Sequence, residues 1–260
     1  MLDQLKKTLR QEIFLPSRLG IVINPLYILR RGLYKGIVDI APKIKGDVLD
    51  FGCGSKPYES LFINAHSYTG VDLAASGHDH KNSKVDVFYN GITLPFPENH
   101  FDAVVSFEVL EHLFNIEEIL VEIKRVLKPY GQILITVPFA YDEHEIPYDF
   151  ARYTSYGIKY ILQKNEIDIV GVYKTTSYVL AVCQMLIAYL ARYISPRSRM
   201  LSRLFQMIII FPLNVMSILL DCILPKRYDY FCNSVVVGIN MKEKAKVCGA
   251  EEYRIIEESE

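Results

Sequence analysis

The chain has 260 residues, half of them hydrophobic and 23% charged, which excludes a wholly disordered protein. Its formal net charge of -1 argues against a nucleic-acid-binding protein that works by bulk electrostatic attraction. The five cysteines are scattered and form no C-x-x-C pair, so we expect no disulfide framework, no zinc site and a reducing compartment.

Composition divides the chain into four segments. Residues 1–45 are amphipathic, contain no long apolar run of the kind found in a signal peptide, and predict a helical segment. Residues 46–177 alternate short apolar runs with helical or turn-rich stretches, which predicts an α/β core. Residues 178–228 are strongly apolar and predict a helical insertion, and residues 229–260 hold one more β-run, Ser234–Met241, and a charged tail.

The first part of the core segment, from about Asp47 to Val137, contains five predicted strands, and a strongly periodic helix separates the last two. Apolar residues recur at helical spacing from Ile116 to Leu127, and Pro129-Tyr130-Gly131 is expected to end this helix. A further helix, Thr154–Asn165, and a further strand, Ile167–Tyr173, follow. The five predicted strands are Val48–Phe51, Tyr68–Leu73, Lys84–Val87, Phe101–Phe107 and Gln132–Val137. Strands that alternate with helices through short connections predict a parallel sheet covered on both faces.

The first strand of this core runs into a glycine bend. Gly52 and Gly54 allow the backbone to approach a ligand closely, and the following helix N-terminus would add a positive dipole. Asp72 follows 20 residues after Gly52, at the end of the next strand, where a carboxylate can accept hydrogen bonds from ribose hydroxyls. The pattern predicts a nucleoside-containing cofactor at the ends of these strands.

Two details separate the candidate cofactors. Pro57 stands where a dinucleotide fingerprint has its third glycine, which argues against a nicotinamide-dependent oxidoreductase. Asp50 lies just before the glycines, where a negative charge would repel a pyrophosphate but attract a sulfonium cation.

Five segments, in order, resemble those of class I S-adenosylmethionine-dependent methyltransferases of the type 11 group. They are VLDFGCGSKPY at 48–58, YTGVDLA at 68–74, VDV at 85–87, LPFPENHFDAVVSFEVLEHL at 94–113 and EIKRVLKPYGQILITVPF at 122–139. The resemblance implies a Rossmann-like, three-layer α/β fold with a seven-stranded, mostly parallel sheet whose last strand is antiparallel. An N-terminal helical cap and an apolar helical insertion before the last strand complete the expected architecture.

The resemblance also implies S-adenosyl-L-methionine as cofactor and a set of residues that bind it. Asp72, with Leu73 beside it, matches the ribose-binding position, and Asp86 and Val87 match the adenine-contacting position. Phe107 and Glu108 match the position beside the methionine moiety. The full cofactor set is Asp50, Gly52, Gly54, Asp72, Leu73, Asp86, Val87, Phe107 and Glu108. Lys56 departs from the family, which often has a small residue there.

The acceptor is expected to lie against the loop that follows the fifth strand, residues 138–154. In this loop, the residue type of His144 makes it a candidate general base. Asp149 and Arg152 are candidate catalytic or acceptor-binding residues. The P-x-D-x-x-R-Y-T stretch resembles one found in methyltransferases tied to surface polysaccharide synthesis. The alternative is that Asp149 and Arg152 form a structural salt bridge at the start of the next helix.

No metal site is predicted in this loop. Glu143-His144-Glu145 groups three metal-ligand types, but adjacent residues rarely ligate one ion alone. Glu111-His112 matches an E-H pair of the family, for which we favour a structural role in which backbone groups satisfy the histidine.

The apolar stretch 178–224 leaves two interpretations open. It is either a helical cap or homodimer interface, or a helical hairpin lying peripherally in a membrane with its arginines on anionic headgroups. Its two apolar runs, Tyr178–Ala191 and Phe205–Leu220, are each shorter than the roughly 20 residues that span a bilayer, and Gln184, Pro212 and Asn214 interrupt them. A transmembrane pair is therefore the least favoured interpretation.

The sequence therefore predicts a methyltransferase that acts on oxygen or nitrogen of a small-molecule, glycan-like or lipid-linked acceptor. We expect it in the cytoplasm, with a peripheral position at the inner face of a membrane under the second interpretation of the apolar stretch. The alternative function is a non-catalytic, methyltransferase-like module that binds a membrane or a partner.

Overall fold

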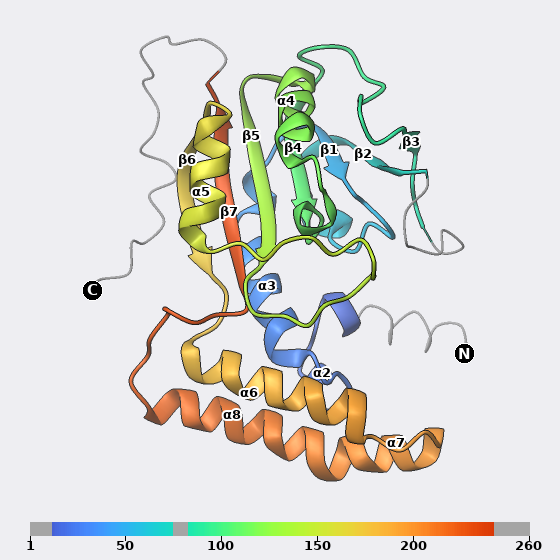
Figure 1. The fold of residues 1–260 in the computed structure, drawn as a ribbon, viewed down its shortest axis with the longest axis vertical. Helices are drawn as coiled ribbons and strands as arrows, with labels where there is room; N and C mark the ends of the chain where they lie inside the picture. The colour runs from blue at the N-terminus through green and yellow to red at the C-terminus, as the bar shows by residue number, and fades with distance from the viewer. Residues whose placement is uncertain (1–11, 75–82, 242–260) are drawn as a thin grey trace. The chain divides into compact units, whose positions relative to one another are not determined.

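The computed structural model describes residues 12–74 and 83–241, which fall into two compact units (Figure 1). The first unit takes its described residues from Met1–Val38, Phe139–Tyr141 and Lys174–Asn233. The second takes them from Asp39–Pro138, Asp142–Tyr173 and Ser234–Glu260, and it contains almost all of the sheet. The predicted charged tail beyond Met241 lies outside the described residues.

The sheet has seven strands in the order β3-β2-β1-β4-β5-β7-β6. Its strands are β1 (Gly46–Phe51), β2 (Ala65–Leu73), β3 (Val87–Tyr89), β4 (Phe101–Phe107), β5 (Leu127–Pro138), β6 (Ile167–Lys174) and β7 (Asn233–Asn240). The β1–β2, β1–β4, β2–β3 and β4–β5 pairs are parallel. Since Asp50 pairs with Gly70 on one side and with Val105 on the other, the carboxyl ends of these strands meet at one edge of the sheet.

The last strand, β7, runs opposite to β5, as the resemblance implied (Figure 1). The backbone amide of Phe139, just past the end of β5, donates to the carbonyl of Cys232 beside the start of β7 at 2.7 Å. At the other end, the side-chain amide of Asn240 donates to the carbonyl of Leu127, where β5 begins, at 3.2 Å. Both contacts require antiparallel neighbours, which confirms a mostly parallel sheet with one reversed strand.

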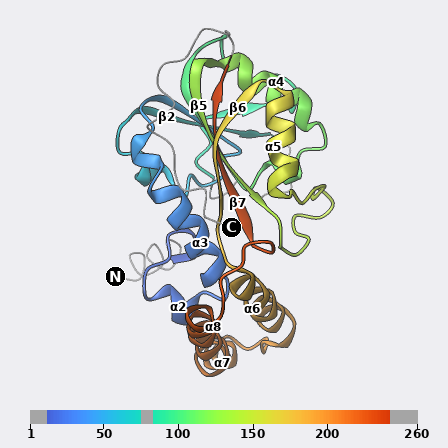
Figure 2. The same cartoon turned by 90° about the vertical axis from the view of Figure 1, so that its left-hand side faces the viewer.

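Two helices of the second unit, α4 (Ile116–Val126) and α5 (Ser155–Lys164), pack on the same face of the sheet (Figure 2). The apolar stripe of α4 is fully buried at Ile119, Leu120 and Ile123. The hydroxyl of Thr154 caps α5 by accepting a hydrogen bond from the amide of Gly157 at 2.9 Å, so this helix begins where the sequence predicted.

The predicted starts of β2, β3 and β5 are wrong. Strand β2 begins at Ala65 rather than Tyr68. The triplet Pro129-Tyr130-Gly131 does not separate α4 from β5, because β5 begins at Leu127, directly after the helix. Its first residues pair with β4 through a register shift, and Tyr130 takes a φ of 61°, as expected for a bulged strand. The third strand begins at Val87 rather than Lys84, so Asp86 lies before the strand.

The first unit consists of helices: α2 (Gly20–Ile23), α3 (Tyr27–Val38), α6 (Tyr178–Tyr189), α7 (Arg199–Phe205) and α8 (Phe211–Ile223). Within the described residues, one helix, Arg199–Ile223, is long and apolar enough to cross a membrane by length and composition. The expectation that each apolar run is too short is therefore wrong for this run. Pro212 does not end the helix, because it lies in the first turn of α8, after a π-helical turn at Gln206–Ile210.

The helices α6 and α8 bury polar side chains. Gln184 of α6 is fully buried; its carbonyl oxygen accepts from the amide of Leu29 at 3.1 Å, and its amide donates to the carbonyl of Pro25 at 2.9 Å. Asn214 of α8 is also fully buried and donates to the carbonyl of Ile21 at 3.0 Å. The side chains of Gln184 and Asn214 thus form hydrogen bonds with the backbone inside the first unit.

Candidate active site

The glycine bend after β1 has the backbone geometry that a ligand loop needs. Gly52 and Gly54 have φ values of 72° and 47°, in the left-handed region that favours glycine. A Cβ atom on Gly52 would lie 2.4 Å from the side chain of Val109, so this position admits no side chain. A Cβ atom on Gly54 would meet no atom within 4 Å, so open space lies beside the backbone at that residue.

Asp72 lies at the end of β2 and is bound to the glycine bend. One of its carboxylate oxygens accepts from the amide of Gly54 at 3.0 Å, and the other accepts from the amide of Leu73 at 2.7 Å. The residue is 9% exposed. The predicted ribose-binding acid and the predicted cofactor loop are therefore in direct contact.

Asp50 is buried on β1, immediately before the bend. Its carboxylate accepts a hydrogen bond from the hydroxyl of Tyr68 at 2.8 Å. Burial raises the pKa of Asp50 from 3.8 to about 7, although this hydrogen bond and the charge of Lys56 act in the opposite direction. A cationic ligand at the bend would stabilise the ionised form, which is the role that the sequence predicted for this residue.

Lys56 holds the bend where the family often has a small residue. Its side chain is almost fully buried, and its ammonium group forms an ion pair with Asp86 and donates to the carbonyl of Tyr68 at 3.2 Å. Asp86 also accepts from the amide of Gly70 at 2.6 Å. Burial favours the neutral form of Asp86, but this hydrogen bond and Lys56 keep the pKa below its ordinary value. Because one Asp86 oxygen is engaged in both contacts, its adenine-binding role stays a prediction.

The other cofactor residues taken from the resemblance lie at the same sheet edge. Leu73 and Val87 are partly buried and pack against the apolar core. The ring of Phe107 packs edge-on against Tyr58, with ring centroids 4.7 Å apart. Glu108 follows β4 with a φ of 57°. The cofactor-binding roles of Leu73, Val87, Phe107 and Glu108 stay predictions.

The candidate catalytic pair Asp149 and Arg152 forms a bidentate ion pair. The two guanidinium nitrogens donate to the two carboxylate oxygens at 2.6 and 2.7 Å, and Asp149 also accepts from the amide of His144 at 2.9 Å. The hydrogen bond from Arg152 lowers the pKa of Asp149 to about 2. This is the structural salt bridge that the sequence offered as the alternative, so a catalytic role for either residue is still a prediction.

His144 is half-buried in the loop after β5. Its burial and the neighbouring ring of His112 lower the pKa of its imidazole, and the two ring centroids are 4.7 Å apart. A neutral imidazole at neutral pH can accept a proton, as a general base must.

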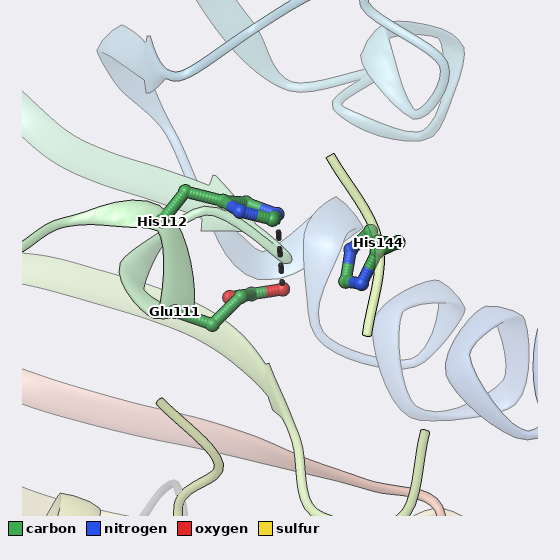
Figure 3. Close-up of side chains that lie close together, drawn as sticks. All are labelled: Glu111, His112 and His144. Carbon is green, nitrogen blue, oxygen red and sulfur yellow. Dashed lines mark ion pairs between the residues drawn. The ribbon is translucent and has the colours of Figure 1, made fainter. Parts of the chain in front are cut away.

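The structure also brings Glu111 and His112 to His144 (Figure 3). The predicted role of Glu111-His112 was structural, and one ring nitrogen of His112 does bind the backbone carbonyl of Tyr148 at 2.6 Å. The grouping with His144 was not predicted, because the pair follows β4 and His144 follows β5. The signal that could have found it is topological: parallel neighbouring strands place the segments after them at one sheet edge.

The chain is similar to known methyltransferases in sequence and in fold. Residues 27–165, which are 139 of the 260 residues, match the family model described as "Methyltransferase domain". A Mycolicibacterium smegmatis protein named "Probable S-adenosylmethionine-dependent methyltransferase" is 33% identical over 35% of this chain and 38% of its own length. A fatty-acid O-methyltransferase of the same species is 34% identical over 34% of this chain and 36% of its own length. The chain thus spans less than half of the length of these curated relatives.

Among solved structures, the fold resembles a chain of the complex between the Haloferax volcanii Trm112 methyltransferase activator and a methyltransferase. The TM-score is 0.51 at 19% identity, over 80% of this chain and 89% of that chain. This likeness bears on the fold alone and agrees with the α/β architecture described above. Since the family model covers more than half of the sequence, the chain belongs to the methyltransferase domain family, as its motifs predicted, and the name of its Mycolicibacterium relative supports S-adenosyl-L-methionine as the cofactor.

Proposed function

We propose that this protein transfers a methyl group from S-adenosyl-L-methionine to an oxygen or nitrogen of a small-molecule, glycan-like or lipid-linked acceptor. The observation that carries the proposal is the hydrogen bond between Gly54 and Asp72, because it joins the open glycine bend to the ribose-binding acid. When bound, the cofactor supplies a methyl group activated by its sulfonium.

The residues at the bend suit this cofactor. The open space beside Gly54 leaves room for a ligand against the backbone, and Asp72 presents a carboxylate that two hydroxyl groups could share. The buried carboxylate of Asp50 favours a cation over a phosphate at the same place.

The acceptor side of the proposal rests on the loop after β5. We assign His144 the task of removing a proton from the acceptor, because its imidazole is kept neutral and only half-buried. Arg152 is already paired with Asp149, so we assign this pair to holding the loop and His144 in place. Similarity to a fatty-acid O-methyltransferase supports an oxygen acceptor on an apolar carrier.

Titration calorimetry of the purified chain with S-adenosylmethionine, S-adenosylhomocysteine and NAD tests the cofactor site. We expect micromolar binding of the first two, at least 10-fold weaker binding in Asp72→Ala, and no binding of NAD. Asp168→Ala removes an exposed aspartate on β6 and is expected to leave affinity unchanged. If neither S-adenosylmethionine nor S-adenosylhomocysteine binds, the result would contradict the proposal and favour a non-catalytic module.

We further propose that the protein works at the cytoplasmic face of a membrane, which its apolar hairpin contacts peripherally. The hairpin, residues 178–224, buries Gln184 and Asn214 but leaves large apolar side chains half or more exposed. They include Leu186, Tyr189, Tyr193, Ile194, Met200, Met207, Ile208, Leu219 and Ile223. Apolar residues outside and polar residues inside are typical of a surface that meets lipid rather than water.

Co-sedimentation with anionic liposomes at low salt tests the membrane contact. The exposed residues Arg197, Arg199 and Arg203 lie in the hairpin, and replacing all three with Ser is expected to weaken binding at least 10-fold. The matched control replaces three exposed lysines of the second unit with Ser: Lys45, Lys84 and Lys164. Equal loss in both triple variants, or no binding by the wild type, would contradict a contact through the hairpin. A stable dimer that ignores liposomes would favour the homodimer interface.

A further inference from the structure

Glu111, His112 and His144 form a compact cluster of metal-ligand types at the carboxyl edge of the sheet (Figure 3). The first two lie on a short helical turn after β4, and His144 lies in the loop after β5. One ligand atom from each residue lies within 4.8 Å of the others. Atoms bonded to one ion at about 2.1 Å lie about 3 to 4 Å apart, so modest rotations of these side chains would bring them to bonding distance.

The buried atoms of Glu111 point to a missing positive charge. Its side chain has no exposed area, and within residues 12–74 and 83–241 neither carboxylate oxygen accepts a hydrogen bond from another residue. A buried carboxylate that accepts no hydrogen bond is costly, because it loses its hydration, and its 3.9 Å ion-pair distance to His112 is too long to replace the lost hydrogen bonds. Glu111 thus supplies evidence for a bound ligand beyond the clustering itself.

A proton alone does not satisfy this cluster. The Nε2 atom of His112 is buried and has no hydrogen-bond partner among the described residues. It lies 3.9 Å from a carboxylate oxygen of Glu111 and 3.9 Å from one of Glu145, too far in each case for a hydrogen bond. A cation between these atoms would attract the Nε2 lone pair of His112 and the carboxylates of Glu111 and Glu145 at once.

Backbone carbonyls hold both histidines in the form that binds metals. The Nδ1 atom of His112 lies 2.6 Å from the carbonyl oxygen of Tyr148, and that of His144 lies 3.2 Å from the carbonyl oxygen of Asp142. A carbonyl can only accept, so each Nδ1 carries the proton and each Nε2 carries the lone pair. Ligating histidines in metalloproteins are oriented by the same kind of contact.

The charges around the cluster also favour a cation. Glu108 and Asp149 act electrostatically on Glu111 as negative neighbours, and Arg152 is the positive one. Since Arg152 is paired with Asp149, the remaining local charge is negative.

We propose that Glu111, His112 and His144 bind one divalent first-row transition-metal cation, of the Mn²⁺ to Zn²⁺ series. Two imidazoles and one carboxylate suit these ions better than Mg²⁺ or Ca²⁺, and three protein ligands leave coordination positions open. The site neighbours the glycine bend, because Val109, two residues before Glu111, packs against Gly52. On the basis of the proposed function, the open positions would take an oxygen of the methyl acceptor, which narrows the acceptor to an oxygen-bearing compound. In the metal-bound form the Nε2 atom of His144 would be a ligand, so the cation would take over from His144 the task of making the acceptor hydroxyl easier to deprotonate.

Titration of metal-free protein with Co²⁺, followed by calorimetry and by the visible absorption of the bound ion, tests the site. We expect one equivalent bound with a Kd of micromolar or tighter, a d–d spectrum that reports nitrogen ligands, and at least 100-fold weaker binding in His144→Ala and in Glu111→Gln. His66→Ala and Glu117→Gln remove an exposed histidine and an exposed glutamate elsewhere and should bind Co²⁺ like the wild type.

The outcomes separate this inference from the proposed function. Wild-type protein that binds no Co²⁺, or binds it equally well in His144→Ala, would overturn the metal site, whether or not S-adenosylmethionine binds. Site-dependent Co²⁺ binding would support it even if the cofactor titration failed. Circular dichroism of each variant establishes that it is folded, and His144→Ala serves as the deciding variant if Glu111→Gln does not fold.

Discussion

At the scale of single residues, the two glycines of the bend differ in what surrounds them. Both have positive φ, but only Gly52 faces a neighbour, since a Cβ atom there would lie 2.4 Å from Val109. We expect Gly52→Ala to lower the free energy of unfolding by about 3 kcal/mol, from strain plus overpacking, and Gly54→Ala by about 1 kcal/mol, from strain alone. Urea denaturation of both variants measures the difference.

A double-mutant cycle with Val109 supplies the control for this prediction. Val109→Ala removes the two methyl groups that would lie nearest to the new Cβ atom, so Gly52→Ala should cost about 1 kcal/mol less in that background. Additive effects of the two substitutions would mean that the Gly52–Val109 contact does not constrain the bend.

The buried Asp50 makes stability depend on pH. Its pKa is 3.8 ordinarily and about 7 in the fold, so the folded state holds the proton more tightly than the unfolded state. Stability from this group is present at low pH, falls as the pH rises from about 4 to about 7, and is level above that range. Relative to wild type, Asp50→Asn should therefore gain on the order of 2 kcal/mol between pH 5 and pH 7.

Denaturant titrations of wild type and Asp50→Asn at pH 5, 6, 7 and 8 measure this gain. The exposed Asp168→Asn should parallel the wild type at every pH. The same Asp50→Asn variant should bind S-adenosylmethionine more weakly, because it lacks the negative charge. Parallel stability curves for Asp50→Asn and wild type would show that the carboxylate is not buried as the structure has it.

The residues of the bend also show what the sequence could and could not predict at this scale. Asp50, Gly52, Gly54 and Asp72 were found because their spacing along the chain follows from strand and bend geometry. The ion pair of Lys56 with Asp86 was not found. Its partners are brought together by the pairing of β2 with the segment before β3, which the chemistry of neither residue encodes.

At the scale of elements, Gln184 of α6 accepts a hydrogen bond from a buried backbone amide at the start of another helix. The amide of Leu29 lies in the first turn of α3, where backbone donors have no partner inside the helix, and the Gln184 carbonyl accepts from it at 3.1 Å. Gln184→Leu leaves this buried donor unsatisfied, at a cost of about 1 to 3 kcal/mol. We expect hydrogen exchange at the Leu29 amide to become roughly 10-fold faster or more.

The matched variant for that measurement is Gln163→Leu, which replaces an exposed glutamine of α5. It should leave exchange at Leu29 unchanged. An unchanged rate at Leu29 in Gln184→Leu would mean that α6 does not cap α3.

Element types were more predictable than their ends. The strand Phe101–Phe107 coincides with β4 because its apolar residues are bounded by polar turns. The predicted start of β5 was too late, because proline and glycine normally end structure and here lie within a bulged strand. The second apolar run, Phe205–Leu220, was underestimated, because the helix that contains it extends beyond both of its ends, from Arg199 to Ile223, through a π-helical turn at Gln206–Ile210.

At the scale of the whole molecule, the seven-stranded, mostly parallel sheet was predictable and the grouping of site residues was only partly so. Ordered motifs implied the seven-stranded sheet, and the sheet brings the segments after β1, β2 and β4 to one edge. The meeting of Glu111 and His112 with His144 depends on how the loop after β5 folds back, which no local pattern determines.

The apolar surface of the hairpin leads to a prediction about the molecule as a whole. Leu186, Met207, Ile208 and Leu219 are each more than half exposed, and none belongs to the cofactor site. Each apolar side chain that leaves water contributes about 1.5 to 3 kcal/mol when buried fully. Replacing all four with Gln should therefore lower partition into neutral vesicles at least 100-fold, while affinity for S-adenosylmethionine stays within twofold of wild type.

The control for this variant replaces four exposed apolar residues of the second unit with Gln: Phe114, Val121, Tyr156 and Tyr160. Neutral vesicles remove the contribution of the arginines, so flotation of both variants measures apolar insertion alone. An equal loss in the two variants would make the attraction a general property of exposed apolar residues. If the hairpin variant instead turns a wild-type dimer into a monomer and neither form floats with vesicles, the occupant of this surface is a second copy of the chain.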